Sequence, residues 1–283
     1  MGAGKRLYFN LILYLASVVW RPVGWLRNFT LSRLAGRTMK RKTPSYTMPG
    51  QDGKVARLVL VPGLAAPLEL KRRRRLRTLS LRISPRTGMI KVAAPLGISE
   101  AQIENFVLRH RDWVNTNLDA LPPRRQFTDG ATVPILGKPH LIVHDPDHRG
   151  APMECDGELI VGGRAEHLAR RVRDYLVACA RAEISARADG YASRLGKTIR
   201  KITLRDTHSR WGSCGHGGRL SFSWRLIMAP LHVLDYVVAH EVAHLVEMNH
   251  SPAFWRIVDR LVPDVERAKR WLKDQGAQLL RYG

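Results

Sequence analysis

The chain has 283 residues, and 47 lysines and arginines against 24 aspartates and glutamates give it a formal net charge of +23. A hydrophobic content of 45% excludes an intrinsically disordered chain, and the length allows one large or two modest domains with hydrophobic cores. The three cysteines have neither the spacing of a metal cluster nor the number of a disulfide framework, so a reducing, cytoplasmic location is expected.

The excess of positive charge predicts attraction to polyanions such as nucleic acid, ribosomes or anionic membranes. An arginine-rich proteome would produce the same excess without such a partner. Non-specific binding of nucleic acid through the basic surface therefore stays open as one of two interpretations.

Residues 1–53 are expected to form an N-terminal extension and a linker. Asp52 is the first acidic residue, and the apolar run at residues 7–20 is shorter than the roughly twenty residues that span a bilayer. Three interpretations stay open: an anchor that contacts the membrane surface, a targeting segment, and translated upstream sequence with a functional start at Met39 or Met48. The last is favoured, because strand-like patterning begins only after Met48.

Residues 54–163 are predicted to form a β-rich basic region with one helix. The first strands are expected at residues 55–61, 76–83 and 89–94, the last two as a hairpin. Strict alternation from Leu79 predicts one half-buried face and one basic face. Five consecutive basic residues at 71–75 lead into this hairpin, either as an electrostatic platform for phosphates or acidic peptide or as charge that protects an edge strand.

The helix of this region is predicted to begin at Ser99, where Gln102 completes a capping box, and to end near Leu118. A second hairpin and a short strand follow, at residues 132–135, 140–144 and 158–161.

Residues 164–283 are predicted to form a second domain. It opens with a long helical pattern over residues 164–195, followed by strands at 199–205 and 219–226. An edge strand can bind an extended peptide by adding it to the sheet, and the candidates for this role are residues 209–214 and 219–224.

Three residues near the first of these segments are candidates for contact with a substrate: His208, Arg210 and Trp211. His208 and Arg210 are candidates for stabilising an oxyanion that develops at a reacting carbonyl. The alternative is that Arg210 and Trp211 lock the turn between two strands, and both interpretations stay open.

The central motif consists of His240 and His244 with Glu241 next to the first of them. Pro230 is suited to the start of a helix, and the apolar residues after it predict that this helix is buried. Histidines four apart lie on one face of a helix, so both imidazoles can bind one metal ion while the glutamate reaches a water molecule. The alternative is a pair of core histidines that bind no metal.

His250 is the expected third ligand, because a catalytic zinc usually has three protein ligands and one open position. Asn249 is predicted to end the helix in the left-handed conformation, and Ser251 with Pro252 predicts the start of a new helix. The chain would then turn back with His250 at the corner. The alternative is a surface histidine near a helix cap.

These residues carry a family resemblance. The segments from His240 to Leu245 and from Asn249 to Trp255 resemble the YgjP-like metallopeptidase family, formerly the DUF45 group, which is related to the SprT and WLM-type zinc proteases. The preceding blocks, residues 209–214 and 220–226, support the resemblance. It is strong over about residues 199–271 and weaker over about 70–113. The resemblance implies zinc on the three histidines and a catalytic Glu241, and it supplies no substrate.

The sequence therefore predicts an α+β protein with a zincin-like metallopeptidase domain, whose motif helix packs on a small antiparallel sheet after a β-rich basic region. We expect one Zn²⁺ per chain and hydrolysis of protein or peptide substrates by Glu-assisted attack of zinc-bound water. One alternative is a DNA- or RNA-associated binding protein with a structural metal. Another is a protease that acts on proteins bound to nucleic acid.

Overall fold

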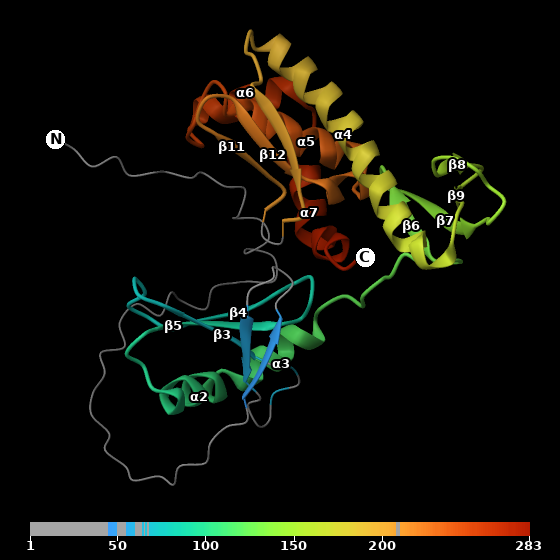
Figure 1. Cartoon of the computed structure of the whole chain (residues 1–283). Helices are drawn as coiled ribbons and strands as arrows, with labels where there is room; N and C mark the ends of the chain where they lie inside the picture. The colour runs from blue at the N-terminus through green and yellow to red at the C-terminus, as the bar shows by residue number, and fades with distance from the viewer. Residues whose placement is uncertain (1–44, 50–54, 60–63, 65, 67, 208–209) are drawn as a thin grey trace. The chain divides into compact units, whose positions relative to one another are not determined.

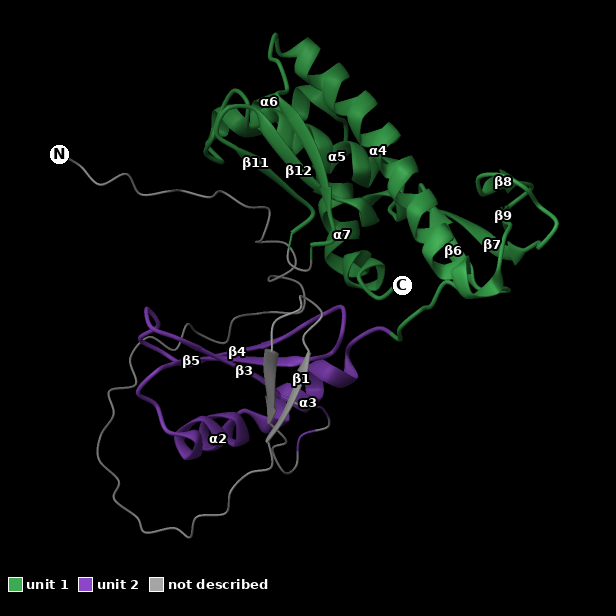
Figure 2. Cartoon of the chain, in the orientation of Figure 1, with its two compact units in different colours: residues 1–21, 123–283 green, residues 22–122 purple. Residues whose placement is uncertain are grey.

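The structure is a computed structural model of the chain that describes residues 45–49, 55–59, 64, 66, 68–207 and 210–283. Contacts divide it into two compact units (Figure 2). Unit 1 contains the described residues from 123 onward, and unit 2 contains those up to residue 122. The apolar run at 7–20, His208 and most of the predicted extension and linker lie outside the described residues, but residues 45–49 of that segment form a β-strand where a linker was predicted. No described helix has the length and apolarity needed to cross a membrane.

The division between the units differs from the boundary expected at residue 164. Residues of the strands between 132 and 161 share a hydrophobic core with the helix that follows them, so they belong to unit 1 together with the predicted second domain. The sequence pattern of short strands continues across residue 122, and only the packing separates the two sets.

Unit 2 is a five-stranded sheet with two helices, coloured from blue to green in Figure 1. Its elements are β1 (Ser45–Pro49), β2 (Val55–Val59), β3 (Leu68–Arg73), β4 (Ser80–Ile83), β5 (Ile90–Pro95), α2 (Glu100–Arg109) and α3 (Arg111–Asp119). Ser99 and Gln102 form the predicted capping box at the start of α2. The single predicted helix is interrupted at His110, whose φ of −105° and ψ of 13° lie outside the helical range.

Arg72, in the basic run, has a structural role in unit 2. Its Nη1 donates to the backbone oxygens of Leu96 and Ile98 at 3.2 and 2.6 Å. This side chain therefore attaches β3 to the connection between β5 and α2. Its neighbours Arg73, Arg74 and Arg75 are exposed.

Unit 1 contains two sheets and four α-helices. Its strands are β6 (Thr132–Ile135), β7 (Lys138–His144), β8 (Met153–Cys155), β9 (Glu158–Val161), β10 (Lys201–Arg205), β11 (Gly212–Gly215) and β12 (Arg219–Ser223). Its helices are η1 (Ala165–His167), α4 (Leu168–Arg194), η2 (Trp224–Met228), α5 (Leu231–Ala243), α6 (Pro252–Leu261) and α7 (Val265–Leu279), where η denotes a 3-10 helix.

The three sheets share one strand arrangement. In each, a strand pairs in parallel with the strand two places later in the chain, and the intervening strand lies antiparallel on the far side of that later strand. The triplets in spatial order are β3-β5-β4, β7-β9-β8 and β10-β12-β11. The sheet beside the motif helix is therefore mixed, whereas an antiparallel sheet was predicted. Sequence alternation identifies strands but not the direction of their partners.

Helix α4 connects the parts of unit 1. Its buried residues recur every four positions: Leu168, Val172, Leu176, Ala180, Ile184, Ala188 and Ala192. This stripe packs in the core against β9, β10, η2 and α5. The predicted strand at residues 219–226 is shorter in the structure and ends at Ser223. The chain from Trp224 to Met228 turns as a 3-10 helix whose five side chains are all buried.

Candidate metal centre

Helix α5 carries the central motif into the core. His240, Glu241 and His244 are each exposed by 2% or less. The first two lie in the last turn of the helix, and His244 is its C-terminal cap. Burial of three polar side chains in an apolar core is unfavourable unless they find partners. This helix therefore has a reason other than stability to carry them.

The turn after α5 brings His250 back to the helix. The backbone N–H groups of Val246 and Glu247 both donate to Ala243 O at 3.0 Å, which closes the helix end. The left-handed conformation expected at Asn249 is wrong, since its φ is not positive. Its side chain instead accepts from the N–H of Ser251 at 2.9 Å.

The start of α6 follows the prediction. Ser251 is the N-cap and accepts from the N–H of Phe254, and Pro252 is the first helical residue. The turn and the cap together fix the position of His250 relative to α5.

The three imidazoles converge on one point. The rings of His240, His244 and His250 lie with centroids 4.8 to 5.0 Å apart. One ligand nitrogen from each lies within 4.8 Å of the others, and the Nε2 atoms of His240 and His250 are 3.0 Å apart. Among the described residues, these three form the cluster with metal-binding geometry. The structure thus brings together the three predicted ligands.

Neighbouring groups orient the rings. Nδ1 of His244 lies 3.0 Å from Glu247 O, so an Nδ1–H donates to this carbonyl oxygen. The unprotonated Nε2 then faces the cluster. The ring of Phe254 packs 4.5 to 4.8 Å from all three imidazoles. An aromatic ring at the base of the cluster excludes water from that side, and sequence reasoning did not assign it this role.

Burial keeps the histidines neutral. It lowers the pKa of His240 well below the usual value, and the two neighbouring imidazoles add to this effect. It also lowers the pKa of His244, to about 4, and that of His250. Neutral imidazoles with free nitrogen lone pairs are the form that binds a metal ion. Nδ1 of His240 is a buried polar atom without a hydrogen-bond partner in the described chain. The donor set therefore fits a divalent metal ion such as zinc.

Glu241 lies beside this cluster without a hydrogen-bond partner for either carboxylate oxygen among the described residues. Burial raises the pKa of its carboxyl to about 8, although the Arg210 guanidinium and the nearby Cys214 amide act in the opposite direction. The carboxylate lies against Gly212 of β11, where a Cβ would be 2.5 Å from Glu241 Cγ and 2.7 Å from Oε1. A side chain at that position would force the Glu241 side chain to shift, and sequence reasoning missed this close approach.

The remaining substrate-contact candidates are in different environments. Arg210 is half-buried, and its carbonyl oxygen accepts from the Thr207 hydroxyl at 2.6 Å. Trp211 is 1% exposed and packs against Gly276 of α7. The structure thus places Trp211 in the core rather than on a substrate-binding surface.

One of the two candidate peptide-binding strands is excluded. β12 is the central strand of its sheet, because β10 and β11 pair with its two sides. β11 is an outer strand of this sheet, and it packs against α5 beside Glu241. The segment at residues 219–224 is therefore unavailable for strand addition, whereas β11 has the required position.

A comparison with known protein families identifies the family of the chain. The profile of the family described as YgjP-like, metallopeptidase domain, matches residues 77–275. No curated protein matches the chain. Among solved structures, it is similar to one described as "Crystal structure of the metallopeptidase zymogen of Pyrococcus abyssi abylysin". That match has 18% identity and a TM-score of 0.30, and it covers 33% of this chain and 95% of the other. The family profile extends over most of the sequence, and the chain belongs to the YgjP-like metallopeptidase family.

Proposed function

We propose that the protein is a zinc-dependent metallopeptidase that hydrolyses peptide bonds with Glu241 as general base. The observation that carries the proposal is a fully buried carboxylate, without a hydrogen-bond partner among the described residues, on the residue that follows the first of three convergent imidazoles. Family membership supports peptide or protein substrates and a metal. A general base needs an environment that leaves its oxygens available to a water molecule.

Each residue has a defined role in this proposal. His240, His244 and His250 hold the metal through one ring nitrogen each, and one zinc per chain is expected. When bound, Zn²⁺ supplies Lewis-acid chemistry that polarises a carbonyl and lowers the pKa of water. Glu241 takes a proton from the attacking water on a carboxylate oxygen and delivers it to the departing amine. Arg210 is the described candidate for stabilising the oxyanion, and His208 stays a prediction.

The substrate is expected to bind as an extended chain along β11. An outer strand offers backbone donors and acceptors to such a chain, and Gly212 places this strand against Glu241. Pairing with β11 would therefore hold a peptide carbonyl near the carboxylate.

A binding protein with a structural metal is the less favoured function. Structural zinc sites are closed by four protein ligands, whereas catalytic sites have three and one open position. The cluster formed by the described residues has three. Nucleic-acid association stays a prediction that the salt dependence of DNA binding would test.

Metal content and hydrolysis measured together test the proposal. We expect one zinc per chain by elemental analysis, and this zinc should be largely lost in His250→Ala. The control is His232→Ala, which should retain the zinc because His232 lies in α5 but outside the cluster. Glu241→Gln should retain the metal and lose about 10²- to 10⁴-fold in the rate of casein or peptide-library hydrolysis. Hydrolysis at the wild-type rate in Glu241→Gln would contradict the assigned base. Full metal retention in His250→Ala would require another third ligand.

A further inference from the structure

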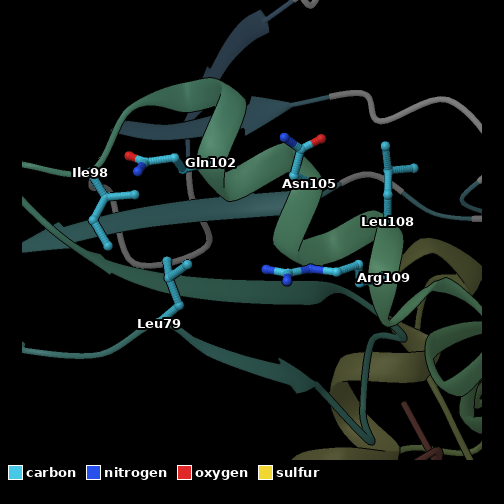
Figure 3. A pocket seen from close by; sticks show the side chains of 6 residues that line it. All are labelled: Leu79, Ile98, Gln102, Asn105, Leu108 and Arg109. Atoms are coloured by element: carbon cyan, nitrogen blue, oxygen red, sulfur yellow. The ribbon is translucent and has the colours of Figure 1, made fainter. Parts of the chain in front are cut away.

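A cavity at the surface of unit 2 lies outside the metal centre and has no assigned role. It is a groove of about 600 Å³ lined by Leu79, Ile98, Gln102, Asn105, Leu108 and Arg109 (Figure 3). This volume is in the range of sites that bind small molecules or peptide side chains. We refer to it as the α2 groove, because four of its residues belong to α2.

The α2 groove combines an aliphatic surface with a single charge. Leu79 and Ile98 form one side, Leu108 is 37% exposed, and Arg109 extends from α2 toward the side of Leu79 (Figure 3). Gln102 is held by the capping box, in which its Oε1 accepts from the N–H of Ser99 at 3.0 Å. A lining of this kind accepts an apolar side chain next to an anionic group.

The acidic residues of α2 are not among the residues that line the α2 groove. Glu100 lies about 200° round the helix from Gln102, and Glu104 lies one turn before Leu108. Arg109 is the charged residue of the lining, and the exposed Arg77, two residues before Leu79, adds to the positive potential.

The segment that lines the α2 groove continues into an outer strand. Leu79 directly precedes β4, and no described strand pairs with the other side of β4. The N–H of Ser84 donates to Met89 O at 2.9 Å, so alternate residues of β4 face β5 and the backbone groups of Leu81 and Ile83 point outward. An outer strand beside a side-chain groove is the arrangement by which an extended peptide adds to a sheet.

The occupant follows from charge and shape. A second copy of a chain with a net charge of +23 would be repelled. Stacking of nucleic-acid bases uses aromatic rings, and the α2 groove is lined by aliphatic and amide side chains and one arginine. We propose that unit 2 binds an extended acidic peptide segment along the outer side of β4, with an apolar side chain in the α2 groove and a carboxylate on Arg109.

This site does not depend on the proposed hydrolytic activity. It would serve to bring an acidic region of a protein to the enzyme, and binding there is measurable without catalysis. All measurements would use the full chain carrying Glu241→Gln, so that hydrolysis cannot remove the probe.

Fluorescence anisotropy with a labelled peptide of alternating valine and glutamate tests the proposal. We expect this peptide to bind more tightly than versions with serine or lysine in place of glutamate. Arg109→Glu should weaken binding about tenfold and favour the lysine peptide, whereas Arg173→Glu, an exposed residue of α4 with the same charge change, should have little effect. Equal weakening by both variants would show general charge attraction and overturn the proposal.

Two further measurements distinguish the contribution of the α2 groove to peptide binding from that of β4. Leu108→Ser, at an exposed position, should weaken binding about threefold without unfolding the chain. A peptide with alternate N-methylated residues cannot donate to a strand and should bind about tenfold more weakly. Binding of the N-methylated peptide at full affinity would overturn strand addition. Binding of an oligonucleotide of equal charge that is unaffected by Arg109→Glu would overturn the choice of an acidic peptide.

Discussion

Two side chains in unit 1 that usually carry a charge are equally buried but differ in their partners. Arg225 and Glu241 are each 1% exposed. The guanidinium of Arg225 donates to Asp206 Oδ1 at 3.0 Å and to the carbonyl oxygens of Leu279 and Tyr282 at 3.1 and 2.6 Å. The carboxylate of Glu241 has no such partner among the described residues.

The difference separates structural from chemical use of a buried charge. Arg225 connects the end of β10, η2 and the end of α7, so its hydrogen bonds hold three segments together. Glu241 forms no such connection among the described residues, and it directly follows His240 in α5. A protein retains an unsatisfied carboxyl in its core at a cost in stability, which is expected where the group has chemistry to perform.

Replacement of the Arg225 side chain is expected to have the largest effect on the free energy of unfolding. Arg225→Met removes the guanidinium that donates to Asp206 and to two carbonyl oxygens, and it should lower the free energy of unfolding by about 3–5 kcal/mol. Urea denaturation measures this. Arg194→Met is the matched control, because Arg194 also donates to two carbonyl oxygens, those of Arg260 and Leu261, but is exposed. Its cost should be about 1 kcal/mol, and equal costs for the two variants would remove the distinction.

The close contact between Glu241 and Gly212 is tested by adding a methyl group at residue 212. Gly212→Ala places a methyl group against the carboxylate, and overpacking should lower the free energy of unfolding by about 1–3 kcal/mol. The same substitution in a Glu241→Ala background should cost less than about 1 kcal/mol, which a double-mutant cycle measures. Gly190→Ala in α4, where a Cβ meets no atom within 4 Å, should instead raise stability slightly. A cost of Gly212→Ala that is independent of residue 241 would contradict the close contact.

Removal of a charge that has hydrogen-bond partners but is partly exposed should have the smallest effect on the free energy of unfolding. Asp235 of α5 accepts from Arg187 Nε at 2.7 Å and from the Tyr191 hydroxyl at 3.3 Å, and its side chain is 28% exposed. Asp235→Asn should lower the free energy of unfolding by about 1 kcal/mol or less, because solvent screens such pairs. Asp259→Asn, at an exposed position of α6, serves as the comparison in the same denaturation experiment. A loss as large as that of Arg225→Met would show that exposure does not decide the cost.

The sequence predicts those parts of the site that depend on local rules. The spacing of His240 and His244 follows from helix geometry, and Ser251 with Pro252 follows from capping. These rules place three ligands within a dozen residues of each other, and the structure brings all three together. The fold class is confirmed for the same reason, since strands and helices have local patterns.

The parts that depend on distant segments were not predictable. Gly212 is one of 23 glycines, and nothing near it indicates that Glu241 of a later helix will lie against it. The burial of Arg225 depends on carbonyl groups more than fifty residues away. The parallel pairing of β10 with β12 likewise follows from packing, because alternation is the same for either direction.

The strand arrangement shared by the three sheets has a consequence for the order of synthesis. In each triplet, the strand that lies between the other two is made last. In the sheet beside α5, β10 and β11 have no common partner until the chain has been extended from Lys201 to Ser223. At 5–20 residues per second on the ribosome, this delay is on the order of seconds. During that time the first two strands of the triplet are in the nascent chain without the strand that pairs with both. This situation occurs once for each of the three triplets.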